Sequence, residues 1–158
     1  MTPEQIAKLP YRLNVGVCLT NLHGQVWVGE RLDRPDAWQM PQGGIDEGEA
    51  IRDAGYRELE EETGLSARVV SFVAELAQPI PYDLPAEIIP TLWKGKYRGQ
   101  MQHWLRMGYD GPDDAVDLDA HVREFARWQW MEPGDVLDAI VPFKRDAYIR
   151  VFEGFGLT

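Results

Sequence analysis

The sequence predicts a single-domain α/β protein, and three observations support this class. Stretches of alternating or β-branched apolar residues, typical of strands, lie on both sides of a glycine loop that leads into a helix. Apolar residues at helical spacing close the chain. The length of 158 residues suits one domain, spanning residues 1–158, that buries its own core.

The expected elements can be placed in order along the chain. Strands are predicted, from their apolar or β-branched patterns, at residues 11–22, 25–31, 38–42, 68–76, 100–109 and 125–130. Helices are predicted from about Glu49 to a cap at Gly64, from Pro133 onward, and at residues 143–155. The connecting segments are an arm at 1–9, a hairpin turn at 21–24, a charged loop at 31–36, a proline-rich loop or edge at 78–90 and an acidic turn at 111–119.

The composition argues against several functional classes. One cysteine, Cys18, excludes an internal disulfide and provides no metal-cluster spacing. No apolar run approaches about 20 residues and no basic segment precedes one, so we expect a cytoplasmic protein without a membrane segment. The formal net charge is −10 and no basic stripe is visible, which argues against binding to duplex DNA.

The stretch from Gly43 to Leu65 concentrates the negative charge of the chain. Eight acids lie between Asp46 and Glu62 against two arginines, so six of the ten net negative charges fall here. Three glycines at its start permit backbone conformations that residues with a Cβ avoid. A helix that follows them would carry acids in its first turn, where its dipole favours negative charge.

Three of these acids share one face of the predicted helix. At about 100° per residue, Glu58, Glu61 and Glu62 fall within one sector roughly 100° wide. The same sector holds Ala54, so we expect it to face the protein body. Carboxylates that are gathered and partly desolvated repel each other unless a cation compensates them. Their spacing therefore favours a hard divalent cation such as Mg²⁺ over the alternative of an acidic face exposed to solvent.

One known motif is matched throughout this stretch. All its fixed positions are present, as Gly43, Glu49, Arg57, Glu58, Leu59, Glu61, Glu62, Gly64 and Leu65. This is the Nudix box, G-x5-E-x7-R-E-U-x-E-E-x-G-U, where U is a bulky aliphatic residue. The sequence thus resembles the Nudix hydrolases. The resemblance implies an α/β/α sandwich with a mixed central sheet, a Nudix loop and helix, and a C-terminal helix.

The resemblance also implies a chemistry and assigns roles to residues. It implies hydrolysis of a nucleoside diphosphate linked to another group, with two or three Mg²⁺ or Mn²⁺ ions. The metal ligands would be the catalytic acids Glu58, Glu61 and Glu62, the carbonyl of Gly43 and, outside the box, Glu124. A structural ion pair of Glu49 with Arg57 would hold the loop against the helix. Glu58 is the first choice for the general base, and Glu61 is the alternative.

Motifs outside the box narrow the resemblance to two related groups. They are Tyr11-Arg12-x-Asn14-Val15-Gly16, Trp38-Gln39-Met40-Pro41-Gln42-Gly43-Gly44, Gly99-Gln100-x-Gln102-x-Trp104, Glu124-Phe125-x-x-Trp128-x-Trp130 and Phe143-Lys144-Arg145. Together they resemble bacterial RNA pyrophosphohydrolases and asymmetric diadenosine tetraphosphate hydrolases. The resemblance implies substrate contacts from Arg12, Gln42, Phe143 and Lys144. The proline-rich segment 82–96 departs from the pattern, and it therefore leaves the substrate preference open.

The first expected function is removal of pyrophosphate from the 5′-triphosphate end of RNA. The alternative is cleavage of diadenosine tetraphosphate, a dinucleoside polyphosphate, into ATP and AMP. A ligand sensor without catalysis is disfavoured, because every glutamate of the box is present. Arg31 is either a phosphate contact or a surface charge, and Phe143 either stacks on a base or fills a helix core. The sequence leaves the oligomeric state open.

Overall fold

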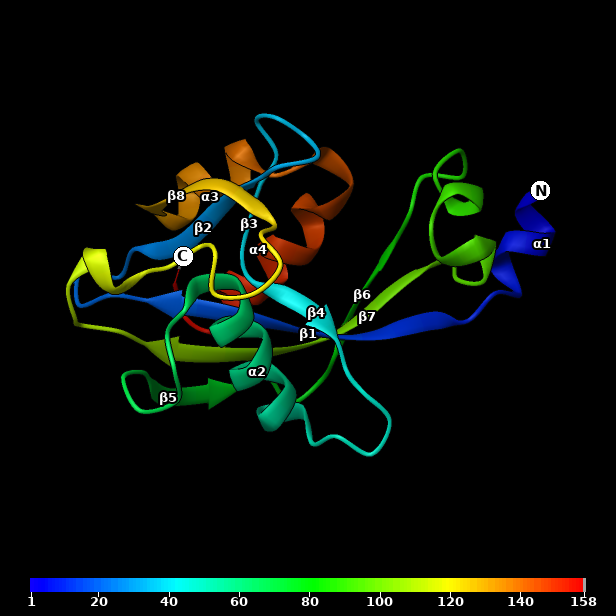
Figure 1. Ribbon diagram of the computed structural model, residues 1–158. Coiled ribbons are helices and arrows are strands. Elements are labelled where there is room, and N and C mark those ends of the chain that lie inside the picture. Colours follow the sequence, from blue (N-terminus) through cyan, green and yellow to red (C-terminus); the bar gives the residue numbers. More distant parts are fainter. Residues whose placement is uncertain (158) are drawn as a thin grey trace.

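The computed structural model describes residues 1–157, and a mixed sheet forms its centre (Figure 1). Strands β1 (Tyr11–Thr20) and β7 (Gly99–Gly108) pair in parallel along their whole length. The antiparallel partners of β7 are β5 (Ser71–Glu75) and β6 (Ile80–Asp83). The antiparallel partners of β1 are β4 (Gln42–Gly44) and β2 (Val26–Arg31), and β2 continues the sheet to β3 (Trp38–Gln39) and β8 (Phe125–Met131).

Helices cover both faces of this sheet. The α-helices are α1 (Pro3–Ala7), α2 (Ile51–Thr63), α3 (Pro133–Ala139) and α4 (Arg145–Gly154). Alternation along β1 separates two cores, because successive side chains of a strand point to opposite faces. Val17 packs in one core with Ala54 and Leu59 of α2, and Cys18 packs in the other with α4. The expected α/β/α sandwich is therefore confirmed.

Several element boundaries differ from the predicted ones. The strand predicted at 38–42 is split into β3 and β4 around Met40 and Pro41, because proline has no N–H for a ladder. The strand predicted at 68–76 contracts to β5. The predicted arm at 1–9 contains α1, with a capping box between Thr2 and Gln5. The closing helix begins at Arg145, after a 3₁₀ turn, Pro142–Lys144.

The long helix α2 begins two residues later than predicted and ends where predicted. Its N-cap is Ala50, because the carboxylate of Glu49 binds Arg57 and the N–H of Asp46 instead of capping the helix. Gly64 closes it in the left-handed conformation, at φ 76°. No helix among residues 1–157 is both long and apolar enough to cross a membrane.

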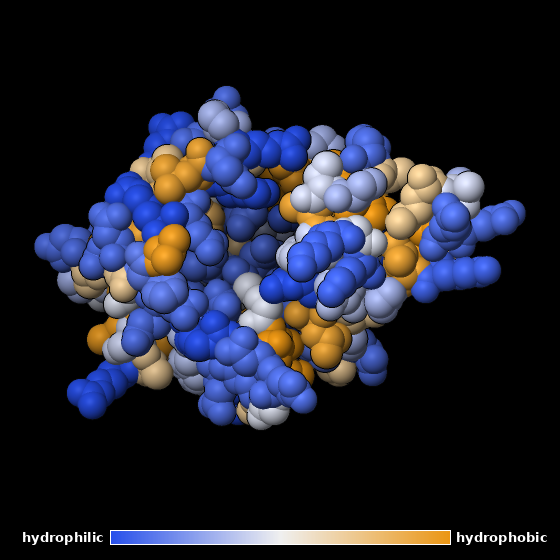
Figure 2. Space-filling model, turned by 45° about the vertical axis from the view of Figure 1, so that its right-hand side comes forward, coloured by the Kyte–Doolittle hydropathy of each residue, from blue (hydrophilic) through white to orange (hydrophobic). Residues whose placement is uncertain are grey.

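The proline-rich segment predicted as a loop or edge contains the edge strand β6. Strand β6 belongs to a larger projection that extends to the right in Figure 1 and is called the arm below. The arm consists of β6, α1, the outer ends of β1 and β7, and the 3₁₀ turns Ile89–Thr91 and Trp93–Gly95. The turned view shows a hollow near the middle of the molecule, lined mainly by hydrophilic residues (Figure 2).

Candidate active site

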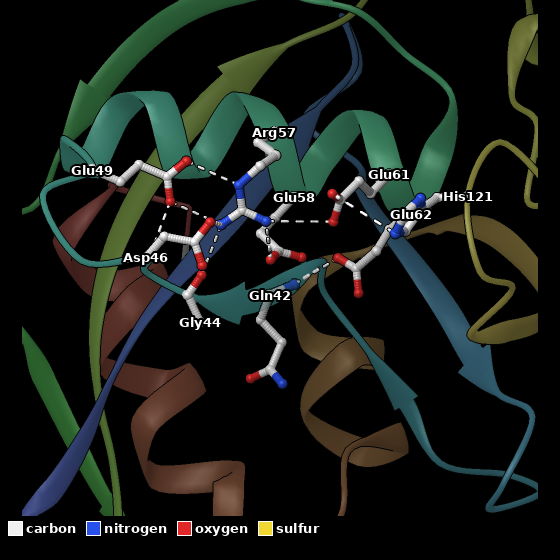
Figure 3. Close-up of polar contacts among 9 residues, drawn as sticks. All are labelled: Gln42, Gly44, Asp46, Glu49, Arg57, Glu58, Glu61, Glu62 and His121. Carbon is white, nitrogen blue, oxygen red and sulfur yellow. Dashed lines mark hydrogen bonds and ion pairs between the residues drawn. The ribbon is translucent and has the colours of Figure 1, made fainter.

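Helix α2 presents the three predicted carboxylates to one side, above β4 (Figure 3). They are buried to different degrees. The side chain of Glu58 is 13% exposed and that of Glu61 is 30% exposed, whereas Glu62 as a residue is only 4% exposed. The helical spacing thus places an acid among residues that are otherwise mainly apolar, such as Leu59.

Arg57 connects this helix with the glycine loop. Its Nε and Nη2 donate to the two carboxylate oxygens of Glu49, each at 2.9 Å, and Nη2 also donates to the carbonyl of Gly44 at 2.9 Å. Its Nη1 donates to Glu58 at 2.7 Å. The expected pair of Glu49 with Arg57 is therefore present, and it is part of a larger cluster that fixes both the loop and one of the acids.

The contact with Arg57 lowers the pKa of Glu49. Hydrogen bonds from the Arg57 guanidinium, and a further one from the backbone N–H of Asp46, lower the pKa of the carboxyl to about 2. The ionised form is therefore stabilised by folding. Ionised Glu49 therefore adds to the free energy of unfolding, in full at pH values above the pKa of a glutamate in the unfolded chain, roughly 4.3. This stabilisation is lost as the pH falls towards the lower pKa of Glu49 in the folded protein.

We expect Glu49→Gln to lower the melting temperature of the metal-free protein at pH 7, since glutamine cannot form the charged fork with Arg57. The difference from wild type should shrink progressively as the pH falls below roughly 4.3. Thermal unfolding followed by circular dichroism from pH 7 to pH 3 measures it. Glu47→Gln, an exposed acid of the same loop, serves as the control; a difference independent of pH would contradict the assignment.

Glu62 is the buried acid of the cluster. Its Oε2 accepts a hydrogen bond from the backbone N–H of Gln42 at 2.9 Å, but its Oε1 is buried and has no partner among the described residues. Burial raises its pKa well above the ordinary value, and the nearby carboxylates of Glu124 and Glu58 raise it further. An orphaned, desolvated carboxylate oxygen of this kind fits a cation ligand.

Glu58 is packed against the backbone of the glycine loop. A Cβ added at Gly43 would collide with the carboxyl group of Glu58, so this position accepts only glycine without rearrangement. Burial raises the pKa of Glu58, against the lowering effect of Arg57. A raised pKa brings a carboxylate nearer to neutral pH, where a general base is most effective.

The remaining acids do not converge on one point. Glu61 contacts Arg57 at 3.4 Å and lies 3.9 Å from Nε2 of His121, which was not among the predicted site residues. Within residues 1–157, no three His, Cys, Asp or Glu side chains form a ready-made metal site. The reason is the contact with Arg57, which draws Glu58 and Glu61 toward the guanidinium. The carboxylate oxygens of Glu58 and Glu61 are suitable ligands for hard cations, but in this structure both side chains contact Arg57.

A pocket of about 180 Å³ is lined by Glu124 and by Gln42, whose backbone N–H binds Glu62. Its lining combines polar, cationic and aromatic residues: Arg31, Gln39, Gln42, Tyr82, Leu84, Leu92, Trp93, Gln100, Glu124, Phe143 and Lys144. Three of the four predicted substrate-binding residues are among them, together with Glu124. The aromatic residues Tyr82 and Trp93 come from the arm. They could not be predicted as site residues, because the proline-rich segment has no clear periodicity.

Lys144 is a buried cation that forms no ion pair with a carboxylate among residues 1–157. It is only 5% exposed, and its Nζ lies 3.3 Å from Oε1 of Gln39. Burial lowers the pKa of the ammonium to about 8, and the positive charges of Arg31 and Arg34 contribute to the lowering. An anion in the pocket would offset both effects, which makes this lysine suited to a phosphate.

The other cations and the aromatic ring are also placed by the structure. Arg12 lies outside the pocket lining but beside Gly44, where an added Cβ would collide with its Nη2. Arg31 lines the pocket, but its guanidinium forms two hydrogen bonds to Asp33, at 2.9 and 2.7 Å. Phe143 packs against the core, and its ring centroid lies 6.0 Å from that of Tyr82. It also lines the pocket, so stacking on a base stays a prediction.

Gln42 is oriented by side chains of the sheet. Its Oε1 accepts from Nε2 of Gln102 at 2.8 Å, and the same nitrogen donates to Oδ1 of Asn14 at 2.9 Å. The neighbouring Gln100 donates to the hydroxyl of Tyr82 at 2.6 Å. Alternation along β7 puts Gln100 and Gln102 on one face of the sheet. This alternation is visible in the sequence and could have indicated that both glutamines face the site.

A family model with the description NUDIX domain matches residues 10–151 of this chain. The chain belongs to the Nudix family. The match covers most of its length and includes the loop and helix with the clustered acids. The expectation drawn from the box is therefore confirmed.

Curated relatives and solved structures agree with this membership. A protein named RNA pyrophosphohydrolase from Dinoroseobacter shibae is 51% identical over 99% of this chain and 98% of its own length. One of the same name from Novosphingobium aromaticivorans is also 51% identical, over 96% of each chain. Among solved structures, the E. coli dihydroneopterin triphosphate pyrophosphohydrolase superposes with a TM-score of 0.69 at 17% identity, covering 89% of this chain and 96% of its own. A C. elegans Ap4A hydrolase complex superposes with 0.68 at 21%, covering 91% and 96%. These two likenesses show the fold alone.

The family membership makes this Nudix hydrolase an enzyme that acts on phosphoanhydride bonds. Enzymes of the family generally use divalent metal ions. The acidic helix face and the orphaned oxygen of Glu62 agree with that requirement.

Proposed function

We propose that this Nudix hydrolase removes pyrophosphate from the 5′-triphosphate end of RNA. Relatives that share half of its residues over nearly its whole length are named for this activity. The observation in this chain that carries the proposal is the buried, half-paired Glu62 beside a pocket lined by the buried lysine Lys144. That combination suits a cation and a phosphate chain side by side. The proposal places the enzyme in the cytoplasm, with RNA ends.

In this proposal, two or three Mg²⁺ or Mn²⁺ ions would be held by Glu58, Glu61, Glu62, Glu124 and the carbonyl of Gly43. When bound, such ions supply positive charge to the phosphates and make a water molecule more acidic. The acidic protein cannot attract polyphosphate by its net charge. Fixed cations from the chain, Arg12 and Lys144, hold the phosphate oxygens in place.

The proposal assigns a role to each of these residues in the chemical step. Glu58 accepts a proton from water, and the oxygen of that water attacks a phosphorus atom of the triphosphate in line with the anhydride bond that breaks. Water and triphosphorylated RNA thereby give monophosphorylated RNA and pyrophosphate. Phe143 offers a ring face to the terminal base, supported by the buried ring of Tyr82, and Gln42 offers its amide to the substrate.

The deciding experiment is a competition between a 5′-triphosphorylated RNA oligomer and diadenosine tetraphosphate, with Mg²⁺ present. We expect the RNA to be consumed preferentially and to yield a 5′-monophosphate together with pyrophosphate. Glu62→Gln protein, purified in parallel, controls for contaminating phosphatases. A strong preference for the dinucleotide, with ATP and AMP as products, would replace the proposal with the alternative function.

A further inference from the structure

Trp93 has a backbone conformation that a bulky residue rarely adopts. Its φ is 46°, in the left-handed region, and that of its neighbour Lys94 is 59°. Such a conformation is strained for a residue with a large side chain, and strained residues concentrate at functional sites. Trp93 lies in the proline-rich segment 82–96, outside the motifs named in the sequence analysis, and it forms part of the pocket wall.

The guanidinium of Arg12 lies over the ring of Trp93. The Cζ atom of Arg12 lies 5.0 Å from the ring centroid, within the range of a cation–π contact. On another side, Nη1 of Arg12 donates to Oε1 of Gln100 at 2.9 Å. Its Nη2 lies against Gly44, at the start of the glycine loop. Three separate elements thus hold one long and otherwise flexible side chain.

These contacts join the arm to the acidic site. Gln100 holds Arg12 through its oxygen and the Tyr82 hydroxyl through its nitrogen. Arg12 therefore stands between the glycine loop and the aromatic wall of the pocket. A phosphate chain that runs from the acids of α2 to a base beside Tyr82 would pass this guanidinium.

We infer that Trp93 is a positioning residue, which holds Arg12 for contact with the phosphate chain of the substrate. This inference rests on the proposed function in one respect, namely that Arg12 binds phosphate. Trp93 also packs against the core and against the ring of Tyr97, so the test must separate packing from positioning. The ring contributes a flat surface for the guanidinium, which a small or branched side chain cannot supply.

Two variants remove the ring in different ways. Trp93→Asn relieves the backbone strain but loses apolar contact, whereas Trp93→Leu keeps apolar bulk. Trp93→Phe retains an aromatic face. We expect both ring-free variants to raise KM for triphosphorylated RNA by about three- to tenfold, on the scale of a cation–π contact, with kcat nearly unchanged. The phenylalanine variant should recover most of the loss.

A double-mutant cycle with Arg12→Ala separates positioning from packing. If Trp93 acts through Arg12, removing the ring should change KM by less than about twofold once Arg12 is absent. Trp130→Asn, a partly exposed tryptophan of β8 outside the pocket, is the matched control and should keep the wild-type KM. Equal effects of ring removal in both backgrounds, or no effect in either, would overturn the inference.

The cycle also distinguishes this inference from the proposed function. Failure of the function would be visible in the wild type, as turnover of a different nucleotide substrate. The cycle can then be repeated with that substrate, because the coupling of Trp93 with Arg12 concerns any polyphosphate. Melting temperatures of all variants show whether a change in KM accompanies a loss of folding.

Discussion

Glu62→Gln should reduce turnover by about 10² or more and, in the same protein, raise the melting temperature of the metal-free form. The loss of activity follows from removing a carboxylate that the proposal places on a metal ion, on the scale of general-base and electrostatic losses. The gain in stability follows from burial. A neutral amide retains an oxygen for the N–H of Gln42 without burying a charge beside Glu124 and Glu58.

The pH dependence has a definite sign. The pKa of Glu62 is raised in the folded state, so ionising it costs stability above the unfolded value of roughly 4.3. Below that value both states are protonated and the cost disappears. The stabilisation by Glu62→Gln should therefore be small near pH 4 and should grow as the pH rises toward the raised pKa.

Divalent ions should reverse the order of stability. An ion that binds the folded protein alone stabilises it, by about 2.7 kcal/mol at a hundred times its Kd. Added Mg²⁺ should thus raise the melting temperature of the wild type much more than that of Glu62→Gln. Glu60→Gln, an exposed acid of the same helix, should behave as the wild type in activity and in its response to Mg²⁺. Wild-type turnover in Glu62→Gln, or an equal Mg²⁺ response, would contradict the metal assignment.

The helix and its acidic face could be predicted from sequence because both depend on local spacing. The period of an α-helix determines which residues share a face, and Gly64 supplies the cap. The start of the helix was misplaced because Glu49 binds Arg57 instead of joining the helix. The Nudix box implied this pair, but helical periodicity alone does not show where the helix begins. Similarly, the contact of Arg57 with Glu58 joins neighbours in sequence, but its geometry depends on where the glycine loop folds back.

The pocket was predictable only in part. Phe143 and Lys144 belong to a motif, and the structure places both in the lining. The opposite wall comes from β6 and the loop after it, where prolines interrupt any period and positive φ values determine the course of the chain. Side chains such as Trp93 reach the site through tertiary structure. Sequence spacing could not show that these side chains line the pocket. For the glutamines of β7 it could, because they alternate with residues that face the other side of the sheet.

Gly43→Ala should reduce turnover by about 10², because the added methyl group needs the space of the Glu58 carboxyl group. Misplacing a reacting group by about 1 Å can cost that much. The backbone of Gly43 is an ordinary strand that pairs with Val15, so the fold should tolerate alanine. Gly134→Ala is the matched control: beyond its own helix, an added Cβ there meets no atom of the described residues within 4 Å, and its turnover should equal that of the wild type.

A double mutant tests whether the damage passes through Glu58. Glu58→Ala removes the carboxyl group and leaves space for the methyl group at position 43. If the collision is the cause, adding Gly43→Ala to Glu58→Ala should change turnover by less than about threefold, because the two changes act on one interaction. Single-turnover rates at saturating Mg²⁺ measure all four proteins. A further tenfold loss in the double mutant, or near-normal turnover in Gly43→Ala alone, would show that the close approach of Glu58 to this glycine is not what catalysis requires.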